Sequence, residues 1–266
     1  MIHTVKVGEL QYLTAENITA PHCFTTRLGG VSRGILSSMN IGTHRGDDPQ
    51  NVVENFRILG SKLGFTPEQL VLTTQTHTDQ IFRVGKAEQG AGLFAPELPE
   101  CDGLITCQPG VALVVFTADC TPILLHDPVT GAVGAVHAGW RGTAAAIGVK
   151  AVEAMVREFG CRPENIRAAI GPNIAGCCFE TDGDVPEAML ERYGSAAGEF
   201  IRRQEEKYYV DLKGINALGL RQAGVTSIAV SHLCTACRQD LFWSHRKVGK
   251  DRGSQGGVIL CKEENP

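Results

Sequence analysis

The chain has 266 residues, of which 43% are hydrophobic and 20% charged, a composition typical of a folded protein with a buried core. Its formal net charge of −4 offers no basic surplus, so a nucleic-acid partner is not indicated. The longest apolar run, residues 111–116, is far shorter than the roughly 20 residues that span a bilayer. We therefore expect no membrane segment, and the lack of a signal-like N-terminus predicts a cytoplasmic protein.

Strand-like runs alternate with helical runs along the chain. Residues 1–25 indicate edge strands and turns. A helix is predicted to start at residues 47–49, where Asp can cap and Pro fits the first turn, and to run through Leu63 until Gly64 ends it. Further helices are expected at residues 143–159, 184–193 and 212–222. Buried strands are expected at residues 71–74, 81–84, 103–106, 111–117, 122–127, 132–136, 166–170, 227–231 and 258–260.

This order predicts an α/β fold, with α+β-like mixed sheet layers and flanking helices. No repeat, low-complexity tract or linker interrupts the sequence. We therefore expect a single domain over residues 1–266.

Three metal-binding side chains stand at the ends of predicted strands. His77 lies between two strands, Cys120 follows the apolar strand at 111–117, and His137 ends the strand at 132–136. Two imidazoles and one thiolate suit zinc, and a fourth position left open is typical of catalytic zinc. The other interpretation of these residues is two structural histidines and a buried thiol.

The chain contains 10 cysteines. In a reducing compartment, most are expected to be small buried hydrophobic residues rather than disulfide partners. Cys234 and Cys237 form a Cys-x-x-Cys pair, but a structural zinc needs two more ligands, and no second such pair occurs in the sequence. This pair therefore ranks below the first site.

Several segments, in this order, resemble one family. They are residues 25–32 (TTRLGGVS), 40–42 (NIG), 75–77 (QTH), 102–103 (DG), 118–122 (ADCTP), 136–142 (VHAGWRG), 171–172 (GP) and 253–257 (GSQGG). The chain resembles the purine nucleoside phosphorylase family formerly called multicopper polyphenol oxidases or laccase-domain proteins. The likeness extends from about residue 22 to 261. It implies an α/β domain with zinc held by His77, Cys120 and His137, which are also the implied catalytic residues.

The resemblance also implies substrates. These are adenosine, inosine, guanosine and methylthioadenosine, which phosphate converts to the free base and ribose-1-phosphate, with adenosine deamination as a second activity. Phosphorolysis needs an anion site, for which residues 139–143 provide a helix start. Arg141 and Gly142 are therefore candidate phosphate ligands, and Arg57 is a further candidate. Trp140 is expected either to stack on the base or to pack in the core. Asp119 is expected to orient a ligand, to shuttle a proton or to cap a turn.

Other functions use the same residues. A metal-free hydrolase or amidase would need only Cys120 as nucleophile and His137 as base. A non-catalytic binding module would need no ligand set at all. A multicopper oxidase requires repeated His-x-His pairs, and none of the 8 histidines is two residues from another. A mononuclear copper-type polyphenol oxidase remains open, because copper can replace zinc on nitrogen and sulfur ligands. The sequence leaves the oligomeric state unknown.

Overall fold

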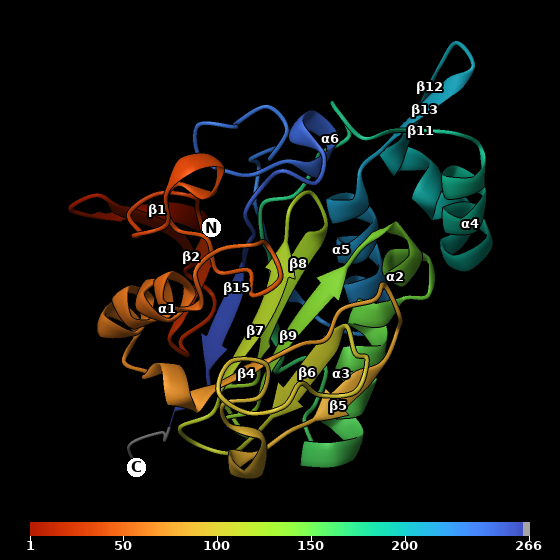
Figure 1. Cartoon of the computed structure of the whole chain (residues 1–266). Coiled ribbons are helices and arrows are strands. Elements are labelled where there is room, and N and C mark those ends of the chain that lie inside the picture. Colours follow the sequence, from red (N-terminus) through yellow and green to blue (C-terminus); the bar gives the residue numbers. More distant parts are fainter. Residues whose placement is uncertain (263–266) are drawn as a thin grey trace.

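The computed structural model describes residues 1–262, and two six-stranded sheets make up most of it (Figure 1). The first sheet has the strand order β1-β2-β3-β15-β7-β4. Its strands are β1 (Ile2–Val7), β2 (Leu10–Ala15), β3 (His22–Thr25), β15 (Gln255–Leu260), β7 (Ala112–Thr117) and β4 (Leu70–Leu72). The C-terminal strand β15 therefore lies in the interior of this sheet, hydrogen-bonded to β3 on one side and to β7 on the other.

The second sheet has the order β14-β10-β8-β9-β6-β5. Its strands are β14 (Ser227–Val230), β10 (Arg167–Ile170), β8 (Thr121–His126), β9 (Val133–Ala138), β6 (Gly103–Thr106) and β5 (Ile81–Arg83). A small third sheet, which the sequence did not predict, joins β11 (Glu180–Thr181), β13 (Lys207–Val210) and β12 (Ile201–Gln204).

The helices flank the sheets. They are α1 (Pro49–Leu63), α2 (Trp140–Ala144), α3 (Ile147–Phe159), α4 (Asp184–Tyr193), α5 (Leu212–Gln222) and α6 (His245–Val248). Asp48 caps α1 by accepting the backbone N–H of Gln50, and Gly64 ends it in the left-handed conformation, as predicted. In the described part of the chain, no helix is long and apolar enough to cross a membrane.

Alternating side chains give each large sheet two buried faces. On β7, Leu113 and Val115 pack in a core that also contains Leu124 of the second sheet. Val114, on the opposite face of β7, packs with residues of α1 such as Phe56. The other face of the second sheet packs against α3 and α5. The layers therefore run α1, first sheet, second sheet, then α3 with α5, which confirms the predicted mixed α/β class.

The single helix predicted for residues 143–159 is wrong at its start. The structure has a short α2 and a separate α3, because Ala146 adopts a left-handed conformation with φ of 56°. The Thr143 carbonyl accepts the Tyr193 hydroxyl at 2.7 Å and the Ala146 backbone N–H at 2.9 Å. These two hydrogen bonds to the Thr143 carbonyl take the place of the regular α-helical hydrogen bond at the break between α2 and α3.

Candidate metal centre and substrate pocket

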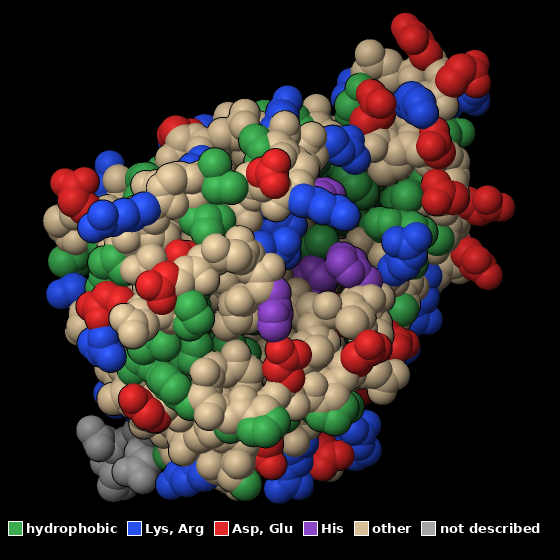
Figure 2. All heavy atoms as spheres, in the orientation of Figure 1, with side chains coloured by type: hydrophobic (Ala, Val, Ile, Leu, Met, Phe, Trp, Pro, Cys, Tyr) green, Lys and Arg blue, Asp and Glu red, His purple; other side chains and the backbone are tan. Residues whose placement is uncertain are grey.

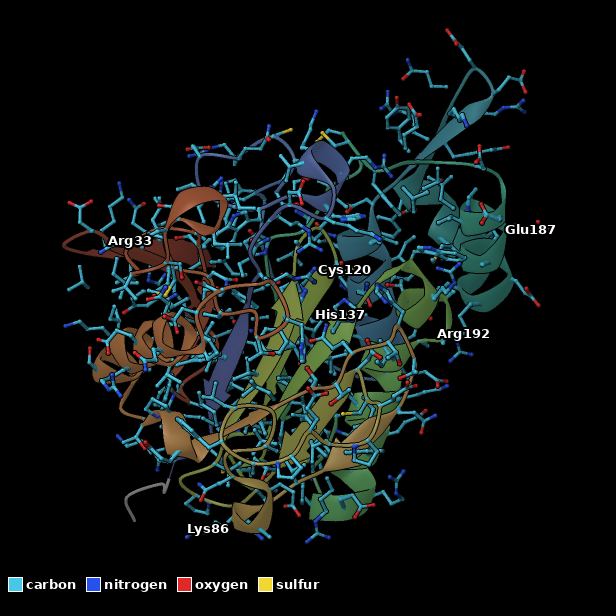
Figure 3. The ribbon with its side chains drawn as sticks, viewed as in Figure 1. Arg33, Lys86, Cys120, His137, Glu187 and Arg192 are labelled. Carbon is cyan, nitrogen blue, oxygen red and sulfur yellow. The ribbon has the colours of Figure 1, made fainter. Side chains whose placement is uncertain are left out.

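The three predicted ligands lie where the chain passes between the two large sheets. His77 lies on the segment from β4 of the first sheet to β5 of the second, and Cys120 on the turn from β7 of the first to β8 of the second. His137 lies on β9 opposite Pro122 of β8, close to Cys120 (Figure 3). Two sheet crossings and one neighbouring strand therefore bring together residues that are distant in sequence.

The donor atoms of His77, Cys120 and His137 all lie within 4.8 Å of one another. The Cys120 Sγ and the His77 Nε2 are 3.8 Å apart. In a tetrahedral zinc site, a sulfur and a nitrogen ligand lie about 3.6 Å apart, given the usual bond lengths. The two imidazole rings stand edge to face, with centroids 5.0 Å apart. The arrangement fits one small cation with a position left open.

Asp102 holds both histidines, a role that the sequence analysis missed. Its Oδ1 accepts His137 Nδ1 at 2.6 Å and the His77 backbone N–H at 3.1 Å. Its Oδ2 accepts the backbone N–H groups of Thr76 and Thr78 and the Thr78 hydroxyl, at 3.2, 2.7 and 2.9 Å. Since the carboxylate binds Nδ1–H, the Nε2 of His137 faces the other ligands. Carboxylates placed in this way fix the tautomer and orientation of metal-binding histidines.

The electrostatics of the site favour a thiolate. Burial opposes charge on Cys120, but the neighbouring His137 and His77 outweigh it, so the pKa of the Cys120 thiol lies well below its usual value. Burial also opposes charge on His137, yet Cys120 and Asp102 raise the pKa of its imidazole above the usual value. The group can therefore act as a metal site or, without metal, as a nucleophile paired with a base.

Gly139 leaves room for the ligands. A Cβ atom at this position would lie 2.7 Å from the His77 Cδ2 and 3.4 Å from the Cys120 Sγ. The His77 backbone itself is in the left-handed region, with φ of 65°, and the Asp102 carboxylate holds that turn through the hydrogen bonds of residues 76–78. Both features allow the loop that carries His77 to lie close to the start of α2.

A cavity of about 540 Å³ opens over the three ligands. Figure 2 shows histidine side chains gathered around this hollow, with Lys and Arg side chains on its rim. Aromatic side chains in its wall are Phe116, Trp140 and Phe179, and the cationic ones are Arg45, Arg141, Arg246 and Arg252. A cavity of this size, with apolar walls and a few converging polar groups, is typical of a small-molecule site.

Two of these arginines, Arg45 and Arg252, lie near each other in the cavity wall, Arg45 exposed and Arg252 buried. Arg45 Nε donates to the Ser254 Oγ at 3.1 Å, and Arg252 is 9% exposed with one nitrogen bonded to the Gly253 carbonyl. Among the described residues, the buried Arg252 Nε has no hydrogen-bond partner. Burial, and then the neighbouring Arg45, lower the pKa of Arg252 to about 10. Two adjacent cations with an unused donor form a site for an anion.

Of the three residues predicted to bind phosphate, one lines the cavity and two do not. Arg141 lines the cavity, with its guanidinium 4.3 Å from the centre of the Trp140 ring. Gly142 is buried and is not in the cavity wall. Arg57 lies on the exposed surface of α1, paired with Glu54 one turn earlier, and does not line the cavity. The structure thus gives no support to a phosphate role for Arg57 or Gly142.

Asp119 binds loops around the cavity through hydrogen bonds. Its carboxylate accepts the hydroxyls of Thr235 and Ser244, at 2.6 and 2.9 Å, and the Arg246 backbone N–H at 2.7 Å. With these bonds it fixes the segment that follows β14 beside the ligand turn. These contacts organise loops distant in sequence, a role that differs from those predicted for Asp119. Trp140, in turn, lines the cavity and also packs against a hydrophobic cluster beside α4 and α5.

Comparison with known proteins places the chain in a family. The sequence profile described as "Multi-copper polyphenol oxidoreductase laccase" matches residues 21–262. A Deinococcus radiodurans protein named purine nucleoside phosphorylase is 39% identical over 94% of this chain and 92% of its own length. The Geobacillus stearothermophilus protein named purine nucleoside phosphorylase YlmD is 40% identical over 88% of this chain and 86% of its own.

The fold agrees with these matches. The crystal structure of YlmD from Geobacillus stearothermophilus superposes with a TM-score of 0.92 at 36% identity, covering 98% of this chain and 99% of that one. The structure of the Bacillus licheniformis hypothetical protein YfiH gives a TM-score of 0.88 at 34% identity, covering 96% and 97%. The chain therefore belongs to the laccase-domain family in which several relatives are named purine nucleoside phosphorylases.

Proposed function

We propose that this protein is a zinc-dependent purine nucleoside phosphorylase that also deaminates adenosine. Adenosine, inosine, guanosine and methylthioadenosine are the proposed nucleosides, with phosphate as co-substrate. The observation that carries the proposal is the presence, in one cavity, of a three-residue group suited to bind a metal and of two arginines, the buried Arg252 and the more exposed Arg45. The names of the relatives support the same activity.

We assign the metal to His77, Cys120 and His137. The donor set suits zinc, and the 3.8 Å between the Cys120 Sγ and the His77 Nε2 fits ligands of one tetrahedral ion. Zinc held by these three residues would supply a Lewis acid. Asp102 keeps His137 Nδ1 protonated and holds the His77 loop, so that the ligands are oriented before the ion binds.

In phosphorolysis, a phosphate oxygen attacks the ribose C1′ atom as the bond from C1′ to the base nitrogen breaks. The electron pair of that bond leaves with the base. Arg45 and Arg252 hold the phosphate through charge-assisted hydrogen bonds and keep it in place for attack. The rings of Phe116, Trp140 and Phe179 offer apolar faces to the purine. Arg45 and Arg252 thus take the place of Arg57 and Gly142 as the proposed phosphate ligands, and Arg141 stays a candidate because it lines the same cavity.

In deamination, water replaces the amino group at the purine C6 atom, giving inosine and ammonia. This reaction needs no phosphate, so Arg45 and Arg252 have no direct part in it. It does need the purine edge close to the three ligands, which lie in the same cavity. The two reactions therefore share the metal group and differ in their use of the arginine pair.

The experiment is to incubate adenosine with the zinc-loaded protein, with and without phosphate, and to separate the products. Adenine and ribose-1-phosphate are expected with phosphate, and inosine without it. Cys120→Ala should abolish both reactions. Cys107→Ala is the matched control, because this cysteine is also partly buried but does not line the cavity.

Arg252→Gln separates the two reactions. It should remove phosphorolysis and leave deamination. Phosphorolysis that survives in Cys120→Ala would show that the ligand group is not needed for it. Absence of turnover of any of the four nucleosides by zinc-loaded protein would overturn the whole assignment.

The lowered pKa of Cys120 beside His137 favours one second candidate, a metal-free hydrolase of acyl or amide bonds. Such an enzyme would keep full activity in a chelator, whereas the phosphorylase would lose it. A mononuclear copper oxidase would consume oxygen with a phenol when loaded with copper, but would not need phosphate. Loading the same preparation with zinc or copper and assaying both reactions distinguishes these functions.

A further inference from the structure

A second group of metal-binding side chains lies outside the catalytic ligands. The Sγ atoms of Cys177, Cys178, Cys234 and Cys237 all lie within 4.8 Å of one another. Those of Cys177 and Cys178 are each close to the Cys237 Sγ, at 3.7 and 3.3 Å, and are 3.7 Å from each other. We propose that these four cysteines bind a structural zinc ion.

The spacing of the sulfur atoms fits a single ion. A tetrahedral site with zinc–sulfur bonds of about 2.3 Å has sulfur atoms about 3.8 Å apart. A disulfide requires a separation of about 2.05 Å, and all four cysteines are free thiols in this structure. The Cys234-x-x-Cys237 pair, which lacks two ligands in the sequence, therefore finds them in Cys177 and Cys178, which lie 60 and 59 residues before Cys237.

The surroundings of Cys234 stabilise negative charge on its sulfur. The Ala175 backbone N–H donates to the Cys234 Sγ at 3.4 Å, and the backbone N–H groups of Ala236 and Cys237 stabilise the same thiolate. Backbone donors on the sulfurs orient and tune metal-binding thiolates. Lys213, only 4% exposed, donates to the Leu233 carbonyl, and its ammonium lies in the field of Cys234 and Cys177. A buried cation of this kind partly balances the charge of four thiolates.

The ion would join two segments that form one wall of the cavity. The segment after β10 carries Cys177 and Cys178 beside Phe179, and the segment after β14 carries Cys234 and Cys237 ahead of Arg246. Outside the cysteines, Thr235 N donates to the Asn173 carbonyl, and Arg246 donates to the carbonyls of Cys178 and Glu180. Zinc therefore ties together loops that few regular hydrogen bonds connect, and it acts at a distance from the first metal group.

The test counts metal and does not depend on enzyme activity. Protein purified under reducing conditions is analysed for zinc per chain, with Cys178→Ser as the test variant and Cys107→Ser as its partly buried control. Two equivalents are expected for wild type and for Cys107→Ser, and one for Cys178→Ser. Cys120→Ser, which removes a ligand of the first group, should also retain one equivalent.

Cobalt identifies the ligands of the second ion. In the Cys120→Ser protein, one equivalent of Co²⁺ should give the intense sulfur-to-metal absorption and visible bands of a tetrahedral four-thiolate site. The Cys120→Ser/Cys178→Ser double variant should lose these bands. Absence of the bands in reduced Cys120→Ser protein would overturn the proposal. So would a disulfide among the four cysteines detected by mass spectrometry, or iron in place of zinc in the purified protein.

Discussion

Asp102→Asn tests whether one buried carboxylate organises the catalytic metal group. Asp102 is fully buried and receives five hydrogen bonds, two on Oδ1 and three on Oδ2. An amide keeps only one acceptor oxygen, so at least two donors lose their partner in either orientation. At about 1.5–3 kcal/mol for each bond to a charged group, the expected loss is about 3–6 kcal/mol. At about 2 °C per kcal/mol for a chain of this size, Tm should fall by roughly 6–12 °C.

The same change should weaken zinc binding. Loss of the carboxylate that orients a metal-binding histidine typically reduces affinity by about 10–100-fold. The assay is competition for zinc with a chromophoric chelator, at a temperature where circular dichroism shows both proteins folded. Asp127→Asn is the matched control, because Asp127 is also fully buried and accepts backbone N–H groups, but lies outside the cavity wall. Asp102→Asn protein that binds zinc as tightly as wild type would refute the positioning role.

Three further predictions concern the cavity and the core. Arg252→Lys should raise the phosphate KM by at least about 10-fold, since lysine lacks the planar set of donors; an unchanged KM in steady-state assays would argue against a phosphate contact. Gly139→Ala should displace His77, whose Cδ2 would lie 2.7 Å from the new Cβ, and so reduce zinc retained after dialysis; full retention would contradict this. Burial, then the charge of Arg167, lower the pKa of His126 to about 4, below its unfolded value of 6.5. The unfolded chain therefore binds the extra proton, and about 3 kcal/mol of stability should be lost as pH falls from 6.5 to 4. Denaturant titrations of His126→Gln should show a shallower loss, and identical slopes would exclude His126 as the cause.

Local signals predicted most of the regular elements. The bounds of α1, α4 and α5 agree with expectation, because caps such as Asp48 and Gly64 and the apolar spacing are local properties. Strand pairing is a tertiary property, so the sequence did not indicate that β15 lies between β3 and β7. The small sheet was missed because the strand at Ile201–Gln204 is mostly exposed and carries no apolar alternation.

The site residues also divide into those that the sequence indicated and those that only the fold brings together. Cys120 and His137 lie next to or near the ends of strands, and His77 lies in the loop between β4 and β5; the sequence pattern indicates these positions. Asp102 stands in the matched segment 102–103, but its role could not be recognised, because most of its partners are backbone N–H groups of a loop more than 20 residues earlier. Arg45 and Arg252 come from opposite ends of the chain and meet only through the fold. Their one sequence signal was proximity to the matched segments at residues 40–42 and 253–257, which was not enough to assign a role.

The interior position of β15 has a consequence for folding. This strand is hydrogen-bonded to β3 on one side and to β7 on the other, although both lie far from it in the sequence. Pairing over such sequence separations closes long loops, which slows folding. Until β15 has docked, β3 and β7 each present an unpaired strand edge. Substitutions that weaken β15 are therefore expected to slow the assembly of the first sheet and to favour aggregation of the partly folded chain.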